Sequence, residues 1–405
     1  MRPIVMISSW PPRMCGIATF AEEALEFIAK AEPDRPTHVI CHTDGEGENV
    51  HPVIDMDRED WYGPVVEKVR ELDPEVIHIQ HEYGLYNYVD EEGQGDGNRG
   101  FLRMLEELSD FPTVVEPHTV HGRMKESEEE FVRDLAARCS VLFFKCHYQK
   151  WRLEWNFSSR GWAMPENIMI VPHGARPDRR WGIDQIDDLK RELGLEEFID
   201  KRIIGLVGWI QSNKRWDVLT SMWEDIYHEI REKTGEKWHL FAAGSMRDPN
   251  HKPDYEKYVD ELKLLEREGM ARYFEFVPRG EIYYKVMAIC DFIVLPSLDE
   301  TQSGTLARII ALNKPYVTTA PMEGLTAQTV ESEGGAMFTT KAGLRREVVR
   351  LASNEGLRMR MGNNLREYLD RVVSWEVVAR QYHEAYRMAA AKVREGKEVY
   401  IRPEF

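Results

Sequence analysis

The stretch Asp291–Pro315, DFIVLPSLDETQSGTLARIIALNKP, contains a strand, a loop and the start of a helix, and it decides the fold. Its apolar run Phe292–Leu295 has the length and the β-branched content of a buried parallel strand. After a polar loop, apolar residues recur on one helical face, so a helix is predicted to begin at Ser303 or Gly304. It is predicted to end at Asn313, which tolerates a left-handed backbone conformation. The sequence therefore predicts a parallel α/β fold.

The loop of this stretch is the leading candidate for a binding site. A helix N-terminus that follows a parallel strand offers backbone N–H groups and a positive dipole end to an anion. Carboxylates in such a loop also serve as ordinary stabilisers of a helix start, and that interpretation stays open. The concentration of polar groups favours a site, and the residues concerned are Asp299, Glu300, Thr301, Gln302, Ser303 and Gly304.

Length and composition restrict the class of protein. A chain of 405 residues is too long for one ordinary core, so two domains are expected. The formal charge of −17, from 53 basic and 70 acidic residues, argues against general binding to nucleic acid or anionic membranes. The five cysteines include no CxxC pair, which fits buried thiols in a reducing compartment. No apolar run has the length of a signal peptide or a membrane-spanning helix, so we expect a soluble, cytoplasmic protein.

The N-terminal half alternates strands and helices. Pro3–Ser9 is predicted as the first strand, and Thr19 with Glu22 has the spacing of a capping box, which predicts a helix start at Thr19. In the loop between them, Gly16 lets the backbone approach a ligand or turn sharply. The alternation continues to about residue 175 and is typical of a doubly wound parallel sheet.

Two histidines follow a predicted strand of this half. The strand Thr113–Pro117 presents His118 at its end, and His121 comes shortly after it. A histidine at the carboxyl end of a parallel strand faces the crevice in which such sheets bind ligands, so both are candidate functional residues. A loop histidine that hydrogen-bonds only to backbone is the alternative.

Two further patterns have metal-binding residue types, but neither predicts a metal. His78 and His81 lie on a predicted strand at a spacing that places them on opposite faces. Asp55 and Asp57 have the spacing of a carboxylate pair that holds a divalent ion, and such pairs are common by chance. No metal site is expected.

The strand–helix pattern restarts after a charged segment, residues 176–200, that carries no clear strand. Ile203–Gly208 is predicted as a strand, and Lys214 is predicted to begin a long helix that Gly235 ends. A cation at a helix N-terminus opposes the helix dipole unless an anion is bound there, so Lys214 favours a phosphate site over a merely solvated lysine. After the next strand, Gly244 begins a turn with backbone donors.

The predicted organisation has three parts. Residues 1–185 form an N-terminal Rossmann-like domain, and residues 186–373 form a second one. Residues 374–405 carry a final helix with an aromatic stripe, which we expect to pack back across the domains.

The order of these features resembles a retaining GT-B glycosyltransferase of family 4, among the glycosyl transferases of group 1. The resemblance runs along nearly the whole chain and is strongest in WPPRMCGIATF, VIHIQHEYG, VPHGA, GWIQSNKRWDVL, ETQSGTLARIIALNKP and SWEVVARQY. It implies two doubly wound Rossmann-like domains with a cleft between them, the first for the acceptor and the second for a nucleotide-diphosphate sugar. It also implies transfer of a hexose to a saccharide or small-molecule acceptor, with no metal and no further cofactor.

The resemblance also implies roles for individual residues. Gly16 matches the loop that faces donor and acceptor, and His118 matches the histidine that contacts the transferred sugar. Lys214 matches the lysine that neutralises the donor diphosphate, and Glu300 matches a glutamate that binds the sugar hydroxyls. The remaining candidate contacts of donor or substrate are His121, Trp209, Gly244, Gln302, Ser303 and Gly304.

Two departures from the family pattern concern the nucleotide. Arg308 stands where the second glutamate, the ribose binder, is usual, and Trp209 stands where the lysine usually has an arginine partner. A subgroup with Gln-Ser-Gly in this loop also lacks the second glutamate, and likeness to it indicates mannosyl transfer from GDP-mannose. The alternatives are a glycoside phosphorylase or sugar-nucleotide epimerase of the same fold, and a non-catalytic carbohydrate- or nucleotide-binding protein.

Overall fold

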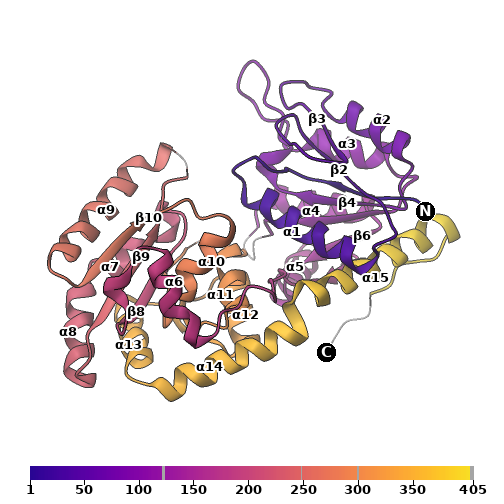
Figure 1. Ribbon diagram of the computed structural model, residues 1–405. Helices are drawn as coiled ribbons and strands as arrows, with labels where there is room; N and C mark the ends of the chain where they lie inside the picture. The colour runs from indigo at the N-terminus through magenta and orange to yellow at the C-terminus, as the bar shows by residue number, and fades with distance from the viewer. Residues whose placement is uncertain (121–123, 248, 299–300, 402–405) are drawn as a thin grey trace. The chain divides into compact units, whose positions relative to one another are not determined.

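The structure is a computed structural model that describes residues 1–120, 124–247, 249–298 and 301–401. The chain divides into two compact units, and each is built on its own parallel sheet (Figure 1). Unit 1 comprises Met1–Gly174 with Trp375–Phe405, and unit 2 comprises Ala175–Ser374. The predicted pair of doubly wound α/β domains is therefore confirmed.

Unit 1 contains a seven-stranded sheet in which every neighbouring pair is parallel. The strand order reverses between β1 and β4, and such a reversal is where doubly wound sheets place their ligand crevice, at the carboxyl ends of the strands. In spatial order the strands are β3 (Val50–Ile54), β2 (Thr37–His42), β1 (Ile4–Ile7), β4 (Val76–His81), β5 (Thr113–Pro117), β6 (Val141–Phe144) and β7 (Ile168–Ile170).

The helices of unit 1 cover both faces of this sheet, because alternate strand residues are apolar toward each side. One face packs against α1 and α15, and the other against α2 to α5. In chain order the helices are α1 (Gly16–Ala31), α2 (Tyr62–Leu72), the short 3-10 turn Tyr83–Leu85, α3 (Arg99–Glu107), α4 (Glu126–Arg138), α5 (His147–Ser159) and α15 (Trp375–Glu395).

The start of α1 differs from the sequence prediction. The helix begins at Gly16 with Cys15 as its N-cap residue, so Thr19 lies inside the first turns and forms no capping box. The Thr19 hydroxyl instead donates to the carbonyl of Cys15 at 3.4 Å. Phe20 and Phe27 on this helix are both buried.

The C-terminal helix α15 belongs to the core of unit 1. Its first residue, Trp375, is fully buried, stacks on Phe27 and donates from its indole nitrogen to Glu23 at 3.1 Å. The predicted aromatic stripe continues with Tyr382 and Tyr386, and both are buried against the sheet.

Unit 2 contains a six-stranded parallel sheet with the same kind of strand order. Its order reverses between β8 and β11, so the ends of these two strands mark the crevice position. In spatial order the strands are β10 (Ala271–Glu275), β9 (Trp238–Gly244), β8 (Arg202–Val207), β11 (Phe292–Leu295), β12 (Tyr316–Thr319) and β13 (Gly335–Phe338).

Helices again cover both faces of the second sheet, with α7, α8, α9 and α13 on one side and α10, α11 and α12 on the other. The longer helices are α6 (Ile186–Glu192), α7 (Trp216–Thr220), α8 (Trp223–Thr234), α9 (Lys252–Arg267), α10 (Gly280–Ala288), α11 (Gly304–Ala311), α12 (Glu323–Ser332), α13 (Lys341–Ala352) and α14 (Glu355–Tyr368). The short turns are Ile183–Gln185, Glu196–Phe198, Ser212–Lys214, Pro249–His251 and the π-helical Leu369–Val373.

The helix predicted to begin at Lys214 starts later and is divided. Lys214 is the last residue of a 3-10 turn, and Arg215 follows in a left-handed conformation with φ of 49°. The helix α7 begins at Trp216, and α8 follows it after a break. The predicted end is correct, since Gly235 caps α8 with φ of 73°.

Within the described ranges, no helix has both the length and the apolarity that crossing a membrane requires.

Candidate active site

Three loops meet at the carboxyl edge of the sheet in unit 2. The backbone N–H of Leu298, in the loop after β11, donates to the carbonyl of Asn213 at 2.7 Å. The N–H of Ile210, in the loop after β8, donates to the carbonyl of Ser245 at 2.9 Å. These bonds join the segments after β8, β9 and β11, which carry most of the predicted donor-binding residues.

Two glycines fix the close approach of β8 and β9 at this edge. A Cβ at Gly244 would lie 1.9 Å from the carbonyl oxygen of Gly208. Gly208 itself has φ of +141°, and a Cβ there would lie 3.2 Å from the hydroxyl of Tyr283. Gly244 is thus required by packing, which is a different reason from the backbone donation predicted for it.

The N-terminus of α11 lies beside these loops and has the predicted start. Ser303 is its N-cap, and the Ser303 hydroxyl accepts a hydrogen bond from the N–H of Leu306 at 3.3 Å. Gly304 is the first helical residue. The first-turn N–H groups of a helix lack intrahelical acceptors and favour an anion. The predicted helix start is therefore confirmed, and an anion site at this N-terminus stays a prediction.

The amide of Gln302 is buried, and the described part of the chain offers it no hydrogen-bond partner. Among the described residues, none forms a hydrogen bond with either Nε2 or Oε1 of this side chain. A buried polar group left unsatisfied costs about 1–3 kcal/mol. A protein keeps such a group most readily where a ligand completes the hydrogen bonds.

Lys214 is placed in the same group of loops. Burial disfavours its charged form and lowers its pKa from 10.5 to about 8, and the nearby Arg247 charge acts in the same direction. Both effects are those expected of a cation kept for an anionic ligand. Trp209 is partly exposed next to Gly208. Glu300 lies outside the described residues.

Arg308 folds back on its own helix. Its guanidinium donates to the carbonyl of Gly304 at 2.8 Å and lies over the rings of Tyr283 and Tyr284, with 5.0 and 5.4 Å to the ring centroids. The Tyr283 hydroxyl in turn shares a hydrogen bond of 2.7 Å with the hydroxyl of Thr305. The arginine thus stabilises the first turn of α11.

In unit 1, a second set of candidates gathers at the carboxyl ends of the strands. His118 follows β5, and His173 follows β7; both rings make edge-on contacts with Phe20 on α1, at centroid distances of 4.8 Å. Gly16 opens the same helix, and a Cβ there would meet no atom within 4 Å. Packing does not explain that glycine. His121 lies outside the described residues.

His118 is connected to a buried polar group that the sequence analysis missed. Its Nε2 lies 2.7 Å from Oε1 of Gln80, and Nε2 of Gln80 donates to the fully buried carboxylate of Glu116 at 2.8 Å. Burial lowers the pKa of His118 to about 3, although the Glu116 charge opposes the shift, so the ring is neutral near pH 7. The signal was present: polar residues interrupt the otherwise apolar strands β4 and β5.

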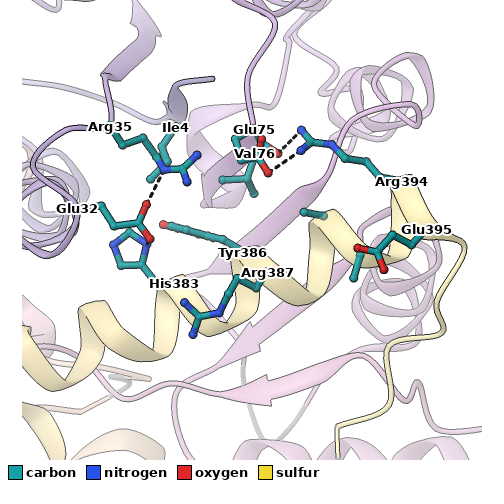
Figure 2. Close-up of a pocket in the computed structure, with 12 residues that line it drawn as sticks. Ile4, Glu32, Arg35, Glu75, Val76, His383, Tyr386, Arg387, Arg394 and Glu395 are labelled. Carbon is teal, nitrogen blue, oxygen red and sulfur yellow. Dashed lines mark hydrogen bonds and ion pairs between the residues drawn. The ribbon is translucent and has the colours of Figure 1, made fainter. Parts of the chain in front are cut away.

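A pocket of about 360 Å³ lies at the other end of this sheet (Figure 2). Its lining includes the first residues of β1 and β4, Ile4 and Val76, so it is remote from the strand ends that carry His118. In the lining of this pocket, Arg35 pairs with Glu32 and Arg394 pairs with Glu75. Because its charges are largely paired with one another, we assign it no ligand.

The two sequence patterns of metal-binding residue types make other contacts in the structure. In the described ranges, no three His, Cys, Asp or Glu side chains form a group that could hold an ion. Asp55 accepts a hydrogen bond from the N–H of Asp57 at 3.1 Å in a local turn. His78 contacts Glu116, whereas His81 contacts Asn98, which agrees with their predicted separation to opposite faces.

Known structures share this architecture. HepE from Anabaena, solved with UDP, has 14% identity and a TM-score of 0.68, covering 95% of this chain and 99% of its own. Sucrose-phosphate synthase from Thermosynechococcus elongatus has 16% identity and a TM-score of 0.69, covering 96% and 100%. WaaG, a glycosyltransferase of lipopolysaccharide biosynthesis, has 15% identity and a TM-score of 0.61, covering 96% and 99%. At such identities the likeness establishes the fold, which is GT-B.

The likeness to known sequences covers less of the chain than the likeness to known structures. No curated protein matches the chain. A family model described as "Glycosyl transferases group 1" matches residues 189–368, which lie in unit 2 and include Lys214 and the start of α11. Residues 189–368 therefore resemble the glycosyl transferases group 1 family, in a chain of GT-B fold.

Proposed function

We propose that this chain is a retaining glycosyltransferase of family 4. It moves a hexose from a nucleotide-diphosphate sugar to a saccharide or small-molecule acceptor, and it uses neither a metal ion nor a further cofactor. The observation that carries the proposal is in unit 2: the amide of Gln302, which has no hydrogen-bond partner among the described residues, adjoins the N-terminus of α11. Lys214, with a pKa of about 8, lies in the loop after β8, which is hydrogen-bonded to the loop after β11.

The chemistry follows from where negative charge develops. As the glycosidic bond to the donor breaks, the leaving diphosphate gains charge. The N–H groups of Gly304 and Thr305 and the ammonium of Lys214 stabilise that charge more strongly in the transition state than in the bound donor. Loss of one such donor group typically costs about 10²–10³ in rate. The Gln302 amide binds a polar group of the donor.

Retention of the anomeric configuration requires no carboxylate base in this proposal. The departing phosphate oxygen takes the proton of the acceptor hydroxyl while that hydroxyl attacks the same face of the sugar. Glu300 and His118 orient the sugar hydroxyls, as the family resemblance implies. A neutral His118 suits this role, because it can hydrogen-bond a hydroxyl without adding charge.

Two donors are supported by different observations. The Gln-Ser-Gly sequence at 302–304 favours GDP-mannose. The structures of HepE from Anabaena with UDP and with UDP-glucose make UDP-glucose the second candidate. Both donors present the same diphosphate to α11, so base and sugar decide between them.

The test is a donor panel. The chain is mixed with GDP-mannose, UDP-glucose, ADP-glucose and inorganic phosphate, each as a thermal-shift series, and each stabilising donor is then followed by NMR for the anomeric configuration of the product. We expect one nucleotide sugar to stabilise the protein and to give a product of retained configuration. Stabilisation by phosphate with phosphorolysis would indicate a phosphorylase, and epimerised donor an epimerase. Binding without turnover of any donor, for any acceptor tried, would support a non-catalytic binding protein.

The expected cellular location is inferred from the cysteines and not from the fold. All five cysteines are free thiols, and four of them are buried. We propose a reducing, cytoplasmic location, which cell fractionation tests directly.

A further inference from the structure

The carboxylate of Glu116 is enclosed by four hydrogen-bond donors. Its Oε1 accepts from the ammonium of Lys145 and from the hydroxyl of Tyr382, the latter at 2.8 Å. Its Oε2 accepts from Nε2 of His78 at 3.0 Å and from Nε2 of Gln80 at 2.8 Å. All five side chains are buried, and Tyr382 comes from α15, far along the chain. We call these five residues the Glu116 cluster.

Glu116 is ionised in this cluster. Burial alone would raise its pKa, but the Lys145 charge and the hydrogen bond from His78 outweigh burial and hold the pKa well below the ordinary value. An ionised carboxylate has only acceptor sites. Every group that contacts Glu116 must therefore present a hydrogen to it.

This requirement fixes the orientation of the Gln80 amide. The NH₂ group has to face Glu116, so the carbonyl oxygen Oε1 faces His118, where Nε2 of the ring lies 2.7 Å away. An amide oxygen only accepts hydrogen bonds, and Nε2 of His118 therefore carries the proton. In a neutral imidazole the other nitrogen, Nδ1, then carries the lone pair.

We propose that Gln80 and Glu116 are positioning residues that hold His118 as its Nε2–H tautomer. Nδ1 is then the acceptor nitrogen of the ring, and the proposed function assigns a substrate hydroxyl to it. The identity of that hydroxyl, on the transferred sugar, rests on the proposed function; the tautomer does not. In a similar way, a histidine that binds a metal through one ring nitrogen is held in one tautomer by a hydrogen-bond partner at its other nitrogen.

The register of the strands supports a role in positioning. Gln80 and Glu116 are direct Cα partners in the β4–β5 pair, and His118 follows two residues later on the same strand end. A buried ionic group in a sheet is generally no more stable than apolar residues of the same volume. The free-energy cost of burying this ionic group is explained if the group sets the tautomer of His118 at the carboxyl edge of the sheet.

The direct test is ¹⁵N NMR of the full-length protein with labelled histidine, because protonated and unprotonated ring nitrogens have well separated shifts. We expect Nε2 of His118 to be the protonated nitrogen at neutral pH. The assignment is made by loss of the signal in His118→Ala. Protonation at Nδ1 would overturn the proposal, whatever the activity.

Two variants test the cause. Glu116→Gln replaces an acceptor-only group by an amide, so the Gln80 amide is free to reverse, and we expect a large part of the His118 population to become Nδ1–H. Gln80→Met removes the acceptor and should shift both ring signals. Asn167→Leu is the control, since Asn167 is a buried amide that bonds to the carbonyls of Ala136 and Cys139. An unchanged His118 spectrum in a folded Gln80→Met protein would overturn the proposal.

The functional consequence is measured separately. With the active donor, Gln80→Met should lower kcat by about tenfold to a hundredfold, as loss of a supporting partner does elsewhere. The affinity for the free nucleoside diphosphate, measured by calorimetry, should stay the same, because the proposed diphosphate site lies in unit 2. If no donor is turned over, the function fails while the tautomer result stands. If the tautomer shifts but kcat does not, the sugar-facing role of Nδ1 is wrong.

Discussion

The carbonyl oxygen of Gly208 occupies the space that a side chain at Gly244 would need. A Cβ on residue 244 would lie 1.9 Å from that oxygen, well inside van der Waals contact. Because the obstacle is backbone, neither strand can yield without breaking the β8–β9 edge. We expect Gly244→Ala to destabilise unit 2 by about 1–3 kcal/mol, the usual cost of overpacking, and to weaken donor binding. Urea unfolding and calorimetry with the donor measure both, and an unchanged variant would contradict this geometry.

For Gly16 we predict that an added Cβ does not lower stability, in contrast to Gly244, because the space around Gly16 is open. A Cβ at Gly16 or at Gly63 would meet nothing within 4 Å, and both glycines lie in the first turn of a helix. Both Gly16→Ala and Gly63→Ala should therefore keep or raise stability, by about 0.4–1 kcal/mol. Only Gly16→Ala should lower the rate of transfer, if the loop before α1 approaches substrate. Equal activity in the two variants would remove Gly16 from the site.

The pKa of Lys214 predicts that donor affinity decreases as the pH rises. Its folded-state pKa of about 8 lies below the ordinary 10.5, so the ammonium is lost as pH rises through 8. Donor affinity should fall above that pH, by up to about tenfold per unit, because a neutral amine does not attract a diphosphate. Lys214→Ala should bind weakly at every pH. Lys214→Arg should bind without the decline, and a decline that persists there would place the titrating group elsewhere.

The sequence predicted best the features that depend on neighbouring residues. The strand Phe292–Leu295, the helix start after Ser303 and the left-handed Asn313, with φ of 53°, all agree with the structure. Each depends on hydrophobic periodicity or on a local cap, and both are visible within a few residues.

Features that depend on tertiary contacts could not be predicted in this way. The 3-10 turn at Lys214 is joined to the loop after β11 by the bond between Leu298 and Asn213, a contact that no local pattern indicates. The Glu116 cluster needs the register that pairs Gln80 with Glu116. It also needs a hydroxyl from α15, whose residue Tyr382 is distant in the chain. Polar residues in apolar strands were a signal, but they did not name their partners.

The ion pair inside the Glu116 cluster predicts a large and pH-dependent loss of stability. Lys145→Met leaves the buried carboxylate without its cation and should cost about 3–5 kcal/mol at pH 7. In the wild type, the depressed pKa of Glu116 contributes stability that is present above about pH 4.5 and is lost as pH falls through the folded-state value. The difference between wild type and variant should therefore shrink in acid.

Urea unfolding at pH 7 and at pH 4 measures this difference. The double variant Lys145→Met with Glu116→Gln should recover part of the loss, because no buried charge remains. Arg2→Met removes a cation from the solvent-exposed pair with Asp73 and should change stability little. A loss for Lys145→Met that is as small as that of Arg2→Met would show that Glu116 is not ionised in the folded protein.

Gln302 combines a cost in stability with a proposed gain in binding, and the two can be separated. Its buried Nε2 and Oε1 have no partner among the described residues, so Gln302→Leu removes an unsatisfied group and should stabilise the ligand-free protein by about 1 kcal/mol or more. The same change should weaken donor binding, since the leucine cannot complete the hydrogen bonds. Gln381→Leu on α15 removes another amide oxygen that no described residue satisfies, and it serves as the control, with donor affinity unchanged. Thermal unfolding with and without donor gives both quantities, and a Gln302→Leu protein that binds donor as the wild type does would mean that this amide is only a packing defect.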